Sequence, residues 1–394
     1  MCKTTTPPRP SAQDKVRQQQ PNSAAGAVIP LQSYLNKYSS ASAAKMVPPG
    51  VPPLPHNVRS TNIPISLLPL LDEAPSSYYA GVFDDEMHFS ASLLKVAALF
   101  AAAQIHADVK ASGSIAAFDS SIATKIQNTA DPLVVAKGIG LVPATSSILK
   151  DSPTVAFLPT FMNSLNSMIG FGTNEGAAAC ITALGYGYIS SALITAGFFD
   201  VSKTRGIWLA GTYVAGIDYV RIHCENDHDD AQVTTTRQML SLFTKIWLDK
   251  IPSNDEDANS TMQDLLSEPK PVDSKGFRDV PWLAASRGPG VAPLFKVSAD
   301  KIGVAGLGSD NTPQVYSEGL IIQWKDSSKI DDFNKTIDPT NANSSIHLSG
   351  EIAVCWQNLL AELITGGTVK NPMFDPIIDI VNDSLSDFFH QAAL

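Results

Sequence analysis

A long helical stretch between two groups of strand-like segments is the feature that most constrains the fold of this chain. Residues 95–290 contain runs without proline that are rich in strong helix formers, and the prolines of this region cluster between the runs. We predict helices at residues 93–105, 115–128, 160–169, 177–198 and 235–250.

Segments rich in aromatic and β-branched residues flank the helical stretch. We predict strands at residues 77–83, 87–90, 293–304 and 315–324. The turn-rich residues 306–313 connect the last two of these strands, which are therefore predicted to form a hairpin. A further helix is expected at residues 349–363. Because strands and helices are segregated, the expected fold class is α+β. An antiparallel sheet would form from N- and C-terminal elements, with a large helical subdomain inserted at about residues 95–290.

The first 60 residues differ from the rest of the chain in composition. They hold ten of the 27 prolines and carry seven Lys/Arg against one acid, with little apolar periodicity. Such a segment buries too little apolar surface to offset its chain entropy. We therefore expect a flexible basic extension at residues 1–60 and one folded domain at residues 61–394.

The whole chain has 28 Lys+Arg against 38 Asp+Glu, a net charge of −10. Nucleic acid is not expected as a partner, because cations supply most of the affinity for its phosphates. Four cysteines in 394 residues make no disulfide framework, and the N-terminus lacks the apolar core of a secretory signal. The compartment stays open, with a cytoplasmic location favoured.

Residues 176–199 contain no charged side chain and are long enough to cross a bilayer. Gly185, Gly187 and several hydroxyl residues interrupt the stretch, and no basic cluster flanks it. We predict a pair of buried helices here and no membrane span.

Ser92 and Lys95 could form a nucleophile and its base. Three residues apart at the start of a helix, both side chains face the same way, and burial of Lys95 would favour the neutral amine that a base needs. The helix N-terminus would stabilise a developing oxyanion. The alternative without a catalytic role is an N-cap serine with a surface lysine.

The serine–lysine spacing alone does not identify a nucleophile, because the chain contains it five times: Ser42/Lys45, Ser92/Lys95, Ser147/Lys150, Ser267/Lys270 and Ser298/Lys301. Only Ser92 connects the end of a predicted strand to a long helix. A second cation, Lys301, lies on a predicted strand, and Gly303 beside it is small enough for a substrate or another backbone to approach closely. Lys301 could equally be a solvated lysine on an edge strand.

Five short segments occur in an order that resembles a known family. They are residues 89–95 (FSASLLK), 168–174 (MIGFGTN), 234–239 (TTTRQM), 297–303 (VSADKIG) and 318–324 (EGLIIQW). Together, over about residues 77–365, they resemble the serine β-lactamase and penicillin-binding-protein superfamily, most closely the class A β-lactamase pattern.

The resemblance implies roles for individual residues. Ser92 would be the acylated nucleophile and Lys95 its base or proton shuttle. Asn174 would contact the substrate amide and Lys95, and Lys301 would make the site positive. The backbone N–H groups of Ser92 and Val304 would form the oxyanion hole. Gly303 would lie against the substrate.

Three departures from the family pattern weaken these roles. Gly172 replaces the serine whose hydroxyl would pass a proton to the leaving nitrogen, a task left to Thr173 if to any residue. Ile302 replaces the threonine that would bind a substrate carboxylate. No glutamate lies in residues 206–212, where a deacylating acid is expected, and we assign neither Asp200 nor Asp218 to that role.

We therefore predict a serine hydrolase or acyltransferase without a cofactor, acting on a β-lactam, ester or peptide-like amide through an acyl-Ser92 intermediate. The alternative is a catalytically lapsed member kept for binding. The ligand-rich residues 223–230 (HCENDHDD) could bind a metal, but their spacing fits no metal motif, and an acidic surface loop is preferred.

Overall fold

The fold is taken from a computed structural model of the chain. It describes residues 30–42, 62–71, 78–226, 229–252, 255–267, 295–306, 314–324, 328, 330–331, 348–361 and 375–390.

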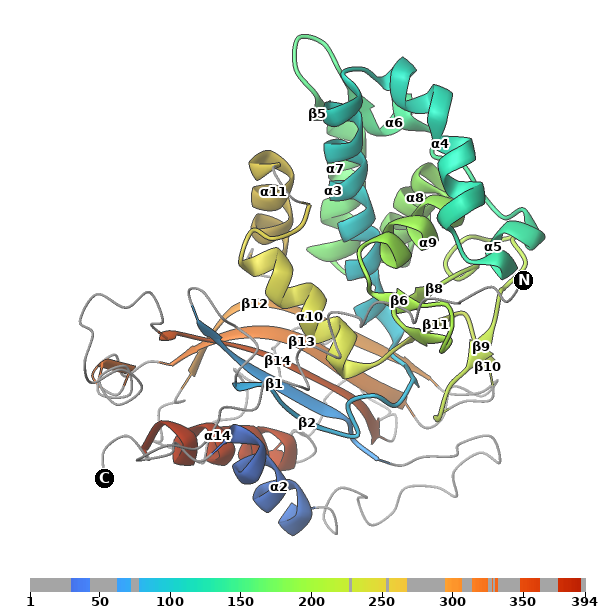
Figure 1. The fold of residues 1–394 in the computed structure, drawn as a ribbon. Coiled ribbons are helices and arrows are strands. Elements are labelled where there is room, and N and C mark those ends of the chain that lie inside the picture. Colours follow the sequence, from blue (N-terminus) through green and yellow to red (C-terminus); the bar gives the residue numbers. More distant parts are fainter. Residues whose placement is uncertain are drawn as a thin grey trace, which may run out of the picture.

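A five-stranded antiparallel sheet forms the base of the molecule (Figure 1). Its strand order is β12-β13-β14-β1-β2. The strands are β1 (Ile65–Leu71), β2 (Ala80–Val82), β12 (Phe295–Gly306), β13 (Gln314–Trp324) and β14 (Leu348–Ala361). The α+β class and the sheet of N- and C-terminal strands are confirmed, as is the pairing of the two strands of the predicted hairpin.

The helix predicted at residues 349–363 is wrong, because this segment is the central strand β14. Its side chains are buried on both faces of the sheet. Ala353 and Cys355 belong to the core under the helical region, and Ile352, Val354 and Trp356 to the core on the opposite face. A strand covered on both faces lacks polar alternation, so periodicity cannot distinguish it from a buried helix. Strand β1 was missed for the same reason.

The helical region lies on one face of the sheet and begins with a short 3₁₀ helix, η3 (Ala91–Leu94). Its α-helices are α3 (Lys95–Ser112), α4 (Ile115–Thr129), α5 (Pro132–Lys137), α6 (Thr145–Ile148), α7 (Pro159–Ile169), α8 (Asn174–Leu184), α9 (Tyr186–Thr195), α10 (Thr236–Trp247) and α11 (Glu256–Ser267).

Short strands connect these helices. β3 (His88–Phe89), β11 (Gln232–Thr234) and β8 (Trp208–Leu209) form a three-stranded sheet. Three further pairs are β4 (Leu149–Lys150) with β5 (Ala156–Phe157), β6 (Phe199–Asp200) with β7 (Arg205–Gly206), and β9 (Ile222–His223) with β10 (Asp229–Asp230).

The uncharged stretch at residues 176–199 is two helices, α8 and α9, bent by 81° at Gly185. Gly185 has φ +76°, and a Cβ there would lie 2.2 Å from the carbonyl oxygen of Gly140. Glycine is therefore required at this break. Among the described residues, the segment Ala91–Ser112 is also long and apolar enough for a membrane, and 78% of its most apolar window is buried inside the protein.

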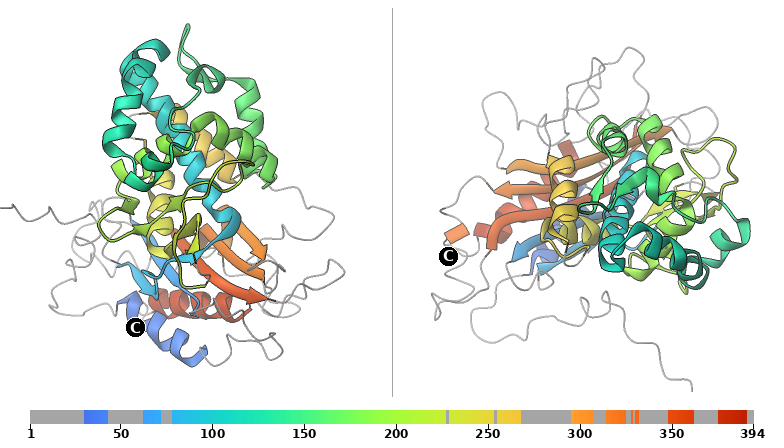
Figure 2. Two further views of the ribbon diagram at one scale, coloured as in Figure 1. Left: turned by 90° about the vertical axis from the view of Figure 1, so that its right-hand side faces the viewer. Right: turned by 90° about the horizontal axis from the view of Figure 1, so that it is seen from above.

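Two helices cover the other face of the sheet: α2 (Leu31–Ser42) and α14 (Asp375–His390) (Figures 1 and 2). Leu31 and Leu35 of α2 are buried in the same core as Phe388 of α14. Part of the predicted flexible extension is thus a packed helix, because α2 covers apolar surface supplied by the C-terminal end of the chain. The rest of residues 1–60 lies outside the described residues.

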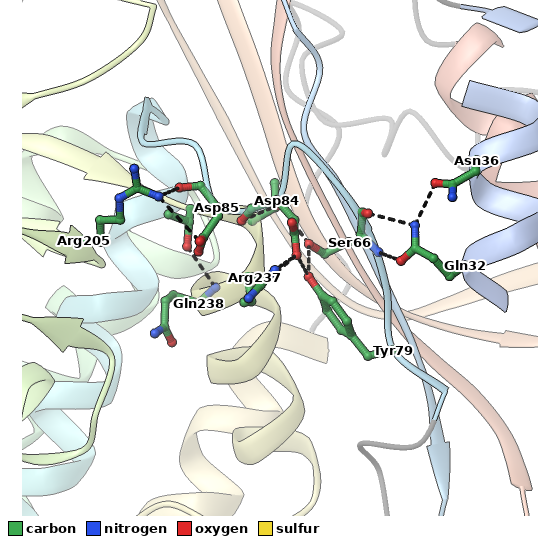
Figure 3. A network of polar contacts seen from close by, with 12 residues as sticks. Gln32, Asn36, Ser66, Tyr79, Asp84, Asp85, Arg205, Arg237 and Gln238 are labelled. Carbon is green, nitrogen blue, oxygen red and sulfur yellow. Dashed lines mark hydrogen bonds and ion pairs between the residues drawn. The ribbon is translucent and has the colours of Figure 1, made fainter. Parts of the chain in front are cut away.

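A polar network joins the sheet to helix α10 (Figure 3). Arg237 of α10 donates from Nε to Asp84 over 2.8 Å, and Asp84 also accepts from the phenol of Tyr79. Ser66 of β1 contacts the Tyr79 hydroxyl over 3.2 Å and donates to Thr236 over 2.8 Å. Because Asp84 is only 8% exposed, this pairing satisfies a charge that would otherwise be costly to bury.

Strand β12 runs directly against η3. A Cβ added to Gly303 would lie 2.3 Å from the carbonyl oxygen of Ser90 and 2.6 Å from the backbone nitrogen of Leu93. Both neighbours are backbone atoms, so they cannot move aside cheaply. Only glycine lets the edge strand and the turn that carries Ser92 approach this closely.

We expect Gly303→Val to lower the free energy of unfolding by about 1–3 kcal/mol, because the new side chain must separate β12 from η3. Urea unfolding measures the loss. Ala305→Val, two residues along the same strand at a half-buried position, is the matched control and should change stability by less than about 1 kcal/mol. Equal losses in the two variants would contradict the required close approach.

His88 of β3 makes the fold sensitive to pH. Burial lowers the pKa of its imidazole from 6.5 to about 4. The unfolded chain therefore binds a proton below pH 6.5 that the folded protein does not take up until about pH 4. This difference removes about 3 kcal/mol of stability as the pH falls through that window.

In His88→Gln this part of the pH dependence should disappear, which urea unfolding between about pH 4.5 and pH 7.5 would detect. His223→Gln, at an exposed histidine, is the control and should keep the wild-type dependence. If wild type and His88→Gln lost stability in parallel on acidification, the assignment to His88 would be wrong.

Candidate active site

Ser92 lies in η3, between the end of β3 and the start of α3. Ala91, Leu93 and Leu94 around it are buried, whereas Ser92 itself is partly exposed. Ala91 has φ +49°, a left-handed conformation that is uncommon for a residue with a Cβ. The fold thus presents one hydroxyl from an otherwise buried and strained turn.

Lys95 is fully buried, one turn after Ser92. Its Nζ donates to the carbonyl oxygen of Gly172 over 2.7 Å and to Oδ1 of Asn174 over 2.9 Å. Both acceptors lie at the start of α8, 77 and 79 residues further along the chain. The structure therefore brings Lys95 into contact with Asn174, one turn after Ser92. The catalytic roles of these three residues remain a prediction.

Thr173 lies between these two acceptors, but its hydroxyl is used elsewhere. The oxygen accepts from the backbone N–H of Gly176 over 3.1 Å, which caps α8, and lies 2.6 Å from the hydroxyl of Ser167 on α7. This hydroxyl stabilises the α7–α8 turn, whereas the amine of Lys95 is bound by the neighbouring Asn174. A role for Thr173 in binding substrate remains a prediction.

Strand β12 supplies the other side of the site. Lys301 is 5% exposed, and its Nζ donates to the carbonyl oxygen of Ile302 over 3.0 Å. It lies two residues before Gly303, so both positions are on the strand face that meets η3. Val304 follows on the opposite face, packed against the core under α14. The oxyanion-hole role of its N–H group remains a prediction.

Tyr213 is a site residue that the sequence analysis missed. Its phenol oxygen lies 3.4 Å from the carbonyl oxygen of Ala91, the residue before Ser92, and its ring centre lies 5.2 Å from Nζ of Lys95. Gln232 of β11 donates from Nε2 to the phenol oxygen and also to the carbonyl oxygen of Ala91. Tyr213 directly follows residues 206–212, where only an acid was sought, and no sequence signal pointed to a phenol.

Burial raises the pKa of Tyr213, and the nearby charge of Asp230 raises it further, although hydrogen bonds from Ser92 and Gln232 oppose the shift. The phenol therefore keeps its proton at neutral pH. Tyr213 also has φ +75°, and Gly172 has φ +69°, so a second and a third segment reach the site in left-handed backbone. Such conformations persist only where the surrounding structure enforces them.

The two carboxylates that flank the expected acid position are engaged elsewhere. Asp200 accepts from Ser202 and pairs with Lys203 over 3.3 Å, and Asp218 lies 3.5 Å from Lys137. Neither contact involves Ser92 or Lys95. In the 223–230 cluster, Cys224 is buried while His223 is exposed beside Glu225, and the described residues contain no group of three potential metal ligands.

No known protein-family model matches the sequence, and no curated protein matches it. Solved structures of other proteins do match this chain. A beta-lactamase from Burkholderia vietnamiensis matches with a TM-score of 0.42 and 12% identity, covering 92% of this chain and 100% of that one. A class A beta-lactamase from Clostridium kluyveri gives 0.40 and 12%, covering 90% and 98%. A class D beta-lactamase from Fusobacterium nucleatum gives 0.39 and 9%, covering 83% and 92%.

At these identities and TM-scores the likeness establishes neither a family nor a function. The chain has an α+β fold, with a five-stranded antiparallel sheet of N- and C-terminal strands and an inserted helical region.

Proposed function

We propose that this protein is a serine hydrolase or acyltransferase that forms an acyl-enzyme on Ser92. The observation that carries the proposal is the buried Lys95, held by Gly172 and Asn174 one turn from a partly exposed serine. The alternative without a catalytic role, an N-cap serine with a surface lysine, is excluded because Lys95 is 0% exposed.

Lys95 would act as the base. A neutral amine keeps two N–H bonds, enough for the carbonyl of Gly172 and the amide oxygen of Asn174, and its lone pair can then take the Ser92 proton. Burial favours this neutral form over the ammonium. The Ser92 oxygen would attack the acyl carbon, and the developing oxyanion would be held by the N–H groups of Ser92 and Val304.

The substrate class that fits is a strained amide such as a β-lactam, an ester or a peptide-like amide. Lys301, on the face of β12 that meets η3, would favour an acyl donor with a negative group. The hydroxyl expected to bind a carboxylate is absent at Ile302, which weakens typical β-lactam recognition. No further partner is needed for this reaction.

A catalytically lapsed binding protein is the second candidate. Gly172 and Ile302 favour it, because each lacks a hydroxyl that the family pattern uses. The contacts of Lys95 oppose it. Two acceptors offset the cost of burying this amine and hold it one turn from Ser92, an arrangement that a protein needing only to bind has no use for.

Ser92→Ala should abolish the covalent adduct that a fluorophosphonate or penicillin probe forms, and Lys95→Met should slow its formation by about 10²-fold or more. Intact-protein mass spectrometry measures both. Ser147→Ala is the matched control, because Ser147 and Lys150 repeat the spacing at exposed positions. An unlabelled wild type with every acylating probe would favour the binding protein.

The acyl-enzyme should be long-lived, because the carboxylates flanking the expected acid position pair with Lys203 and Lys137 rather than meeting Ser92. With a chromogenic ester we expect a burst of about one product per Ser92, followed by slow turnover. Stopped-flow absorbance measures the two phases. Steady turnover without a burst would show that deacylation is fast and that an activating group has been overlooked.

A further inference from the structure

The phenol of Tyr213 lies beside the turn that carries the nucleophile and beside Lys95, whose Nζ is 5.2 Å from the ring centre. Gln232, itself 4% exposed, donates a hydrogen bond to the phenol oxygen. The carbonyl of Ala91 lies 3.4 Å from the phenol oxygen. That contact is long for a hydrogen bond between oxygens, so the phenol proton is weakly held there.

Within the described part of the chain, the segment expected to supply a hydroxyl for the second half of acylation does not do so. Expelling an amine or alkoxide requires an acid that protonates the leaving atom. Gly172 has no side chain to do this, and the hydroxyl of Thr173 caps α8. Tyr213 brings a hydroxyl to the same place from a different segment of the chain.

We propose that Tyr213 is the general acid that protonates the leaving group when Ser92 is acylated. This inference rests on the proposed function and names the acid of that same site. We place Tyr213 in the catalytic site because its phenol oxygen lies 3.4 Å from the carbonyl of Ala91, the residue before the reacting serine, and its ring lies against Lys95, the proposed base.

The proton transfers among Ser92, Lys95 and Tyr213 balance. In the addition step, the Ser92 O–H proton passes to Lys95 as the serine oxygen bonds to the acyl carbon. In the elimination step, the Tyr213 proton passes to the leaving nitrogen or oxygen as its bond to the acyl carbon breaks. The ammonium of Lys95, beside the phenol ring, then returns a proton to the phenolate. The net products are acyl-Ser92 and a protonated leaving group.

Two features suit Tyr213 to this role. Its phenol is protonated before the reaction, as an acid must be, and although burial raises the pKa of Tyr213, the phenol remains a stronger acid than the alcohol that an alkyl ester releases. The nearby cation at Lys95 would stabilise the transient phenolate, because a charge pair interacts strongly in a site with little water. The charge of Asp230 has the opposite effect and favours return of the proton.

The test is the effect of Tyr213→Phe on a series of esters that share one acyl group and range from p-nitrophenyl to ethyl. p-Nitrophenolate leaves without a proton, whereas ethoxide needs one. Acylation of Ser92, followed by mass spectrometry, should slow by less than about 3-fold with the first ester and by about 10²-fold with the last.

Tyr219→Phe is the matched control. Tyr219 belongs to the same loop but is 49% exposed with its ring against Arg221, so its loss should leave every ester unchanged. Thermal unfolding of both variants shows whether the fold is retained.

The outcomes separate the two proposals. If the wild type forms no Ser92-dependent adduct, the proposed function fails, and this inference with it. If the wild type is acylated but Tyr213→Phe slows all esters equally, or none, Tyr213 only supports the structure and this inference alone is wrong.

Discussion

The buried amine of Lys95 is the interaction on which the rest of the site depends. It lies at the first residue of α3, yet both of its acceptors belong to the start of α8. An amine this deeply buried is tolerated only when its N–H groups find oxygens. The contact therefore fixes α3 relative to the α7–α8 turn, and it fixes where Ser92, one turn earlier, can lie.

Three segments reach Ser92 in left-handed backbone, at Ala91, Gly172 and Tyr213. A side chain such as that of alanine or tyrosine is rarely found there, because its Cβ crowds the neighbouring carbonyl. Strain of this kind persists where packing enforces it, and here the packing includes the edge strand β12, whose Gly303 touches the same turn. The site is thus assembled by close backbone approach as well as by side-chain bonds.

Much of the fold followed from the sequence. The helices predicted at residues 115–128, 160–169 and 235–250, and both strands of the hairpin, lie close to their observed bounds. The helix predicted at residues 93–105 extends to Ser112, the one at 177–198 is the bent pair α8 and α9, and α11 and α14 were not predicted. The prediction failed at β1 and β14, which lie in the middle of the sheet and are covered on both faces. It also failed at α2, whose apolar side chains find their partners on α14, more than 300 residues further along the chain.

For the site, the sequence by itself determined the candidate residues: a hydroxyl and an amine one helical turn apart at Ser92 and Lys95, the short segment that contains Asn174, and a strand with Lys301 and Gly303. Local spacing suffices there, because residues three apart on a helix share a face. Only the tertiary structure decided that Lys95 is buried against Gly172 and that the phenol of Tyr213 lies beside the turn that carries Ser92. Those facts depend on contacts between residues 77 and 122 positions apart, which no local pattern encodes.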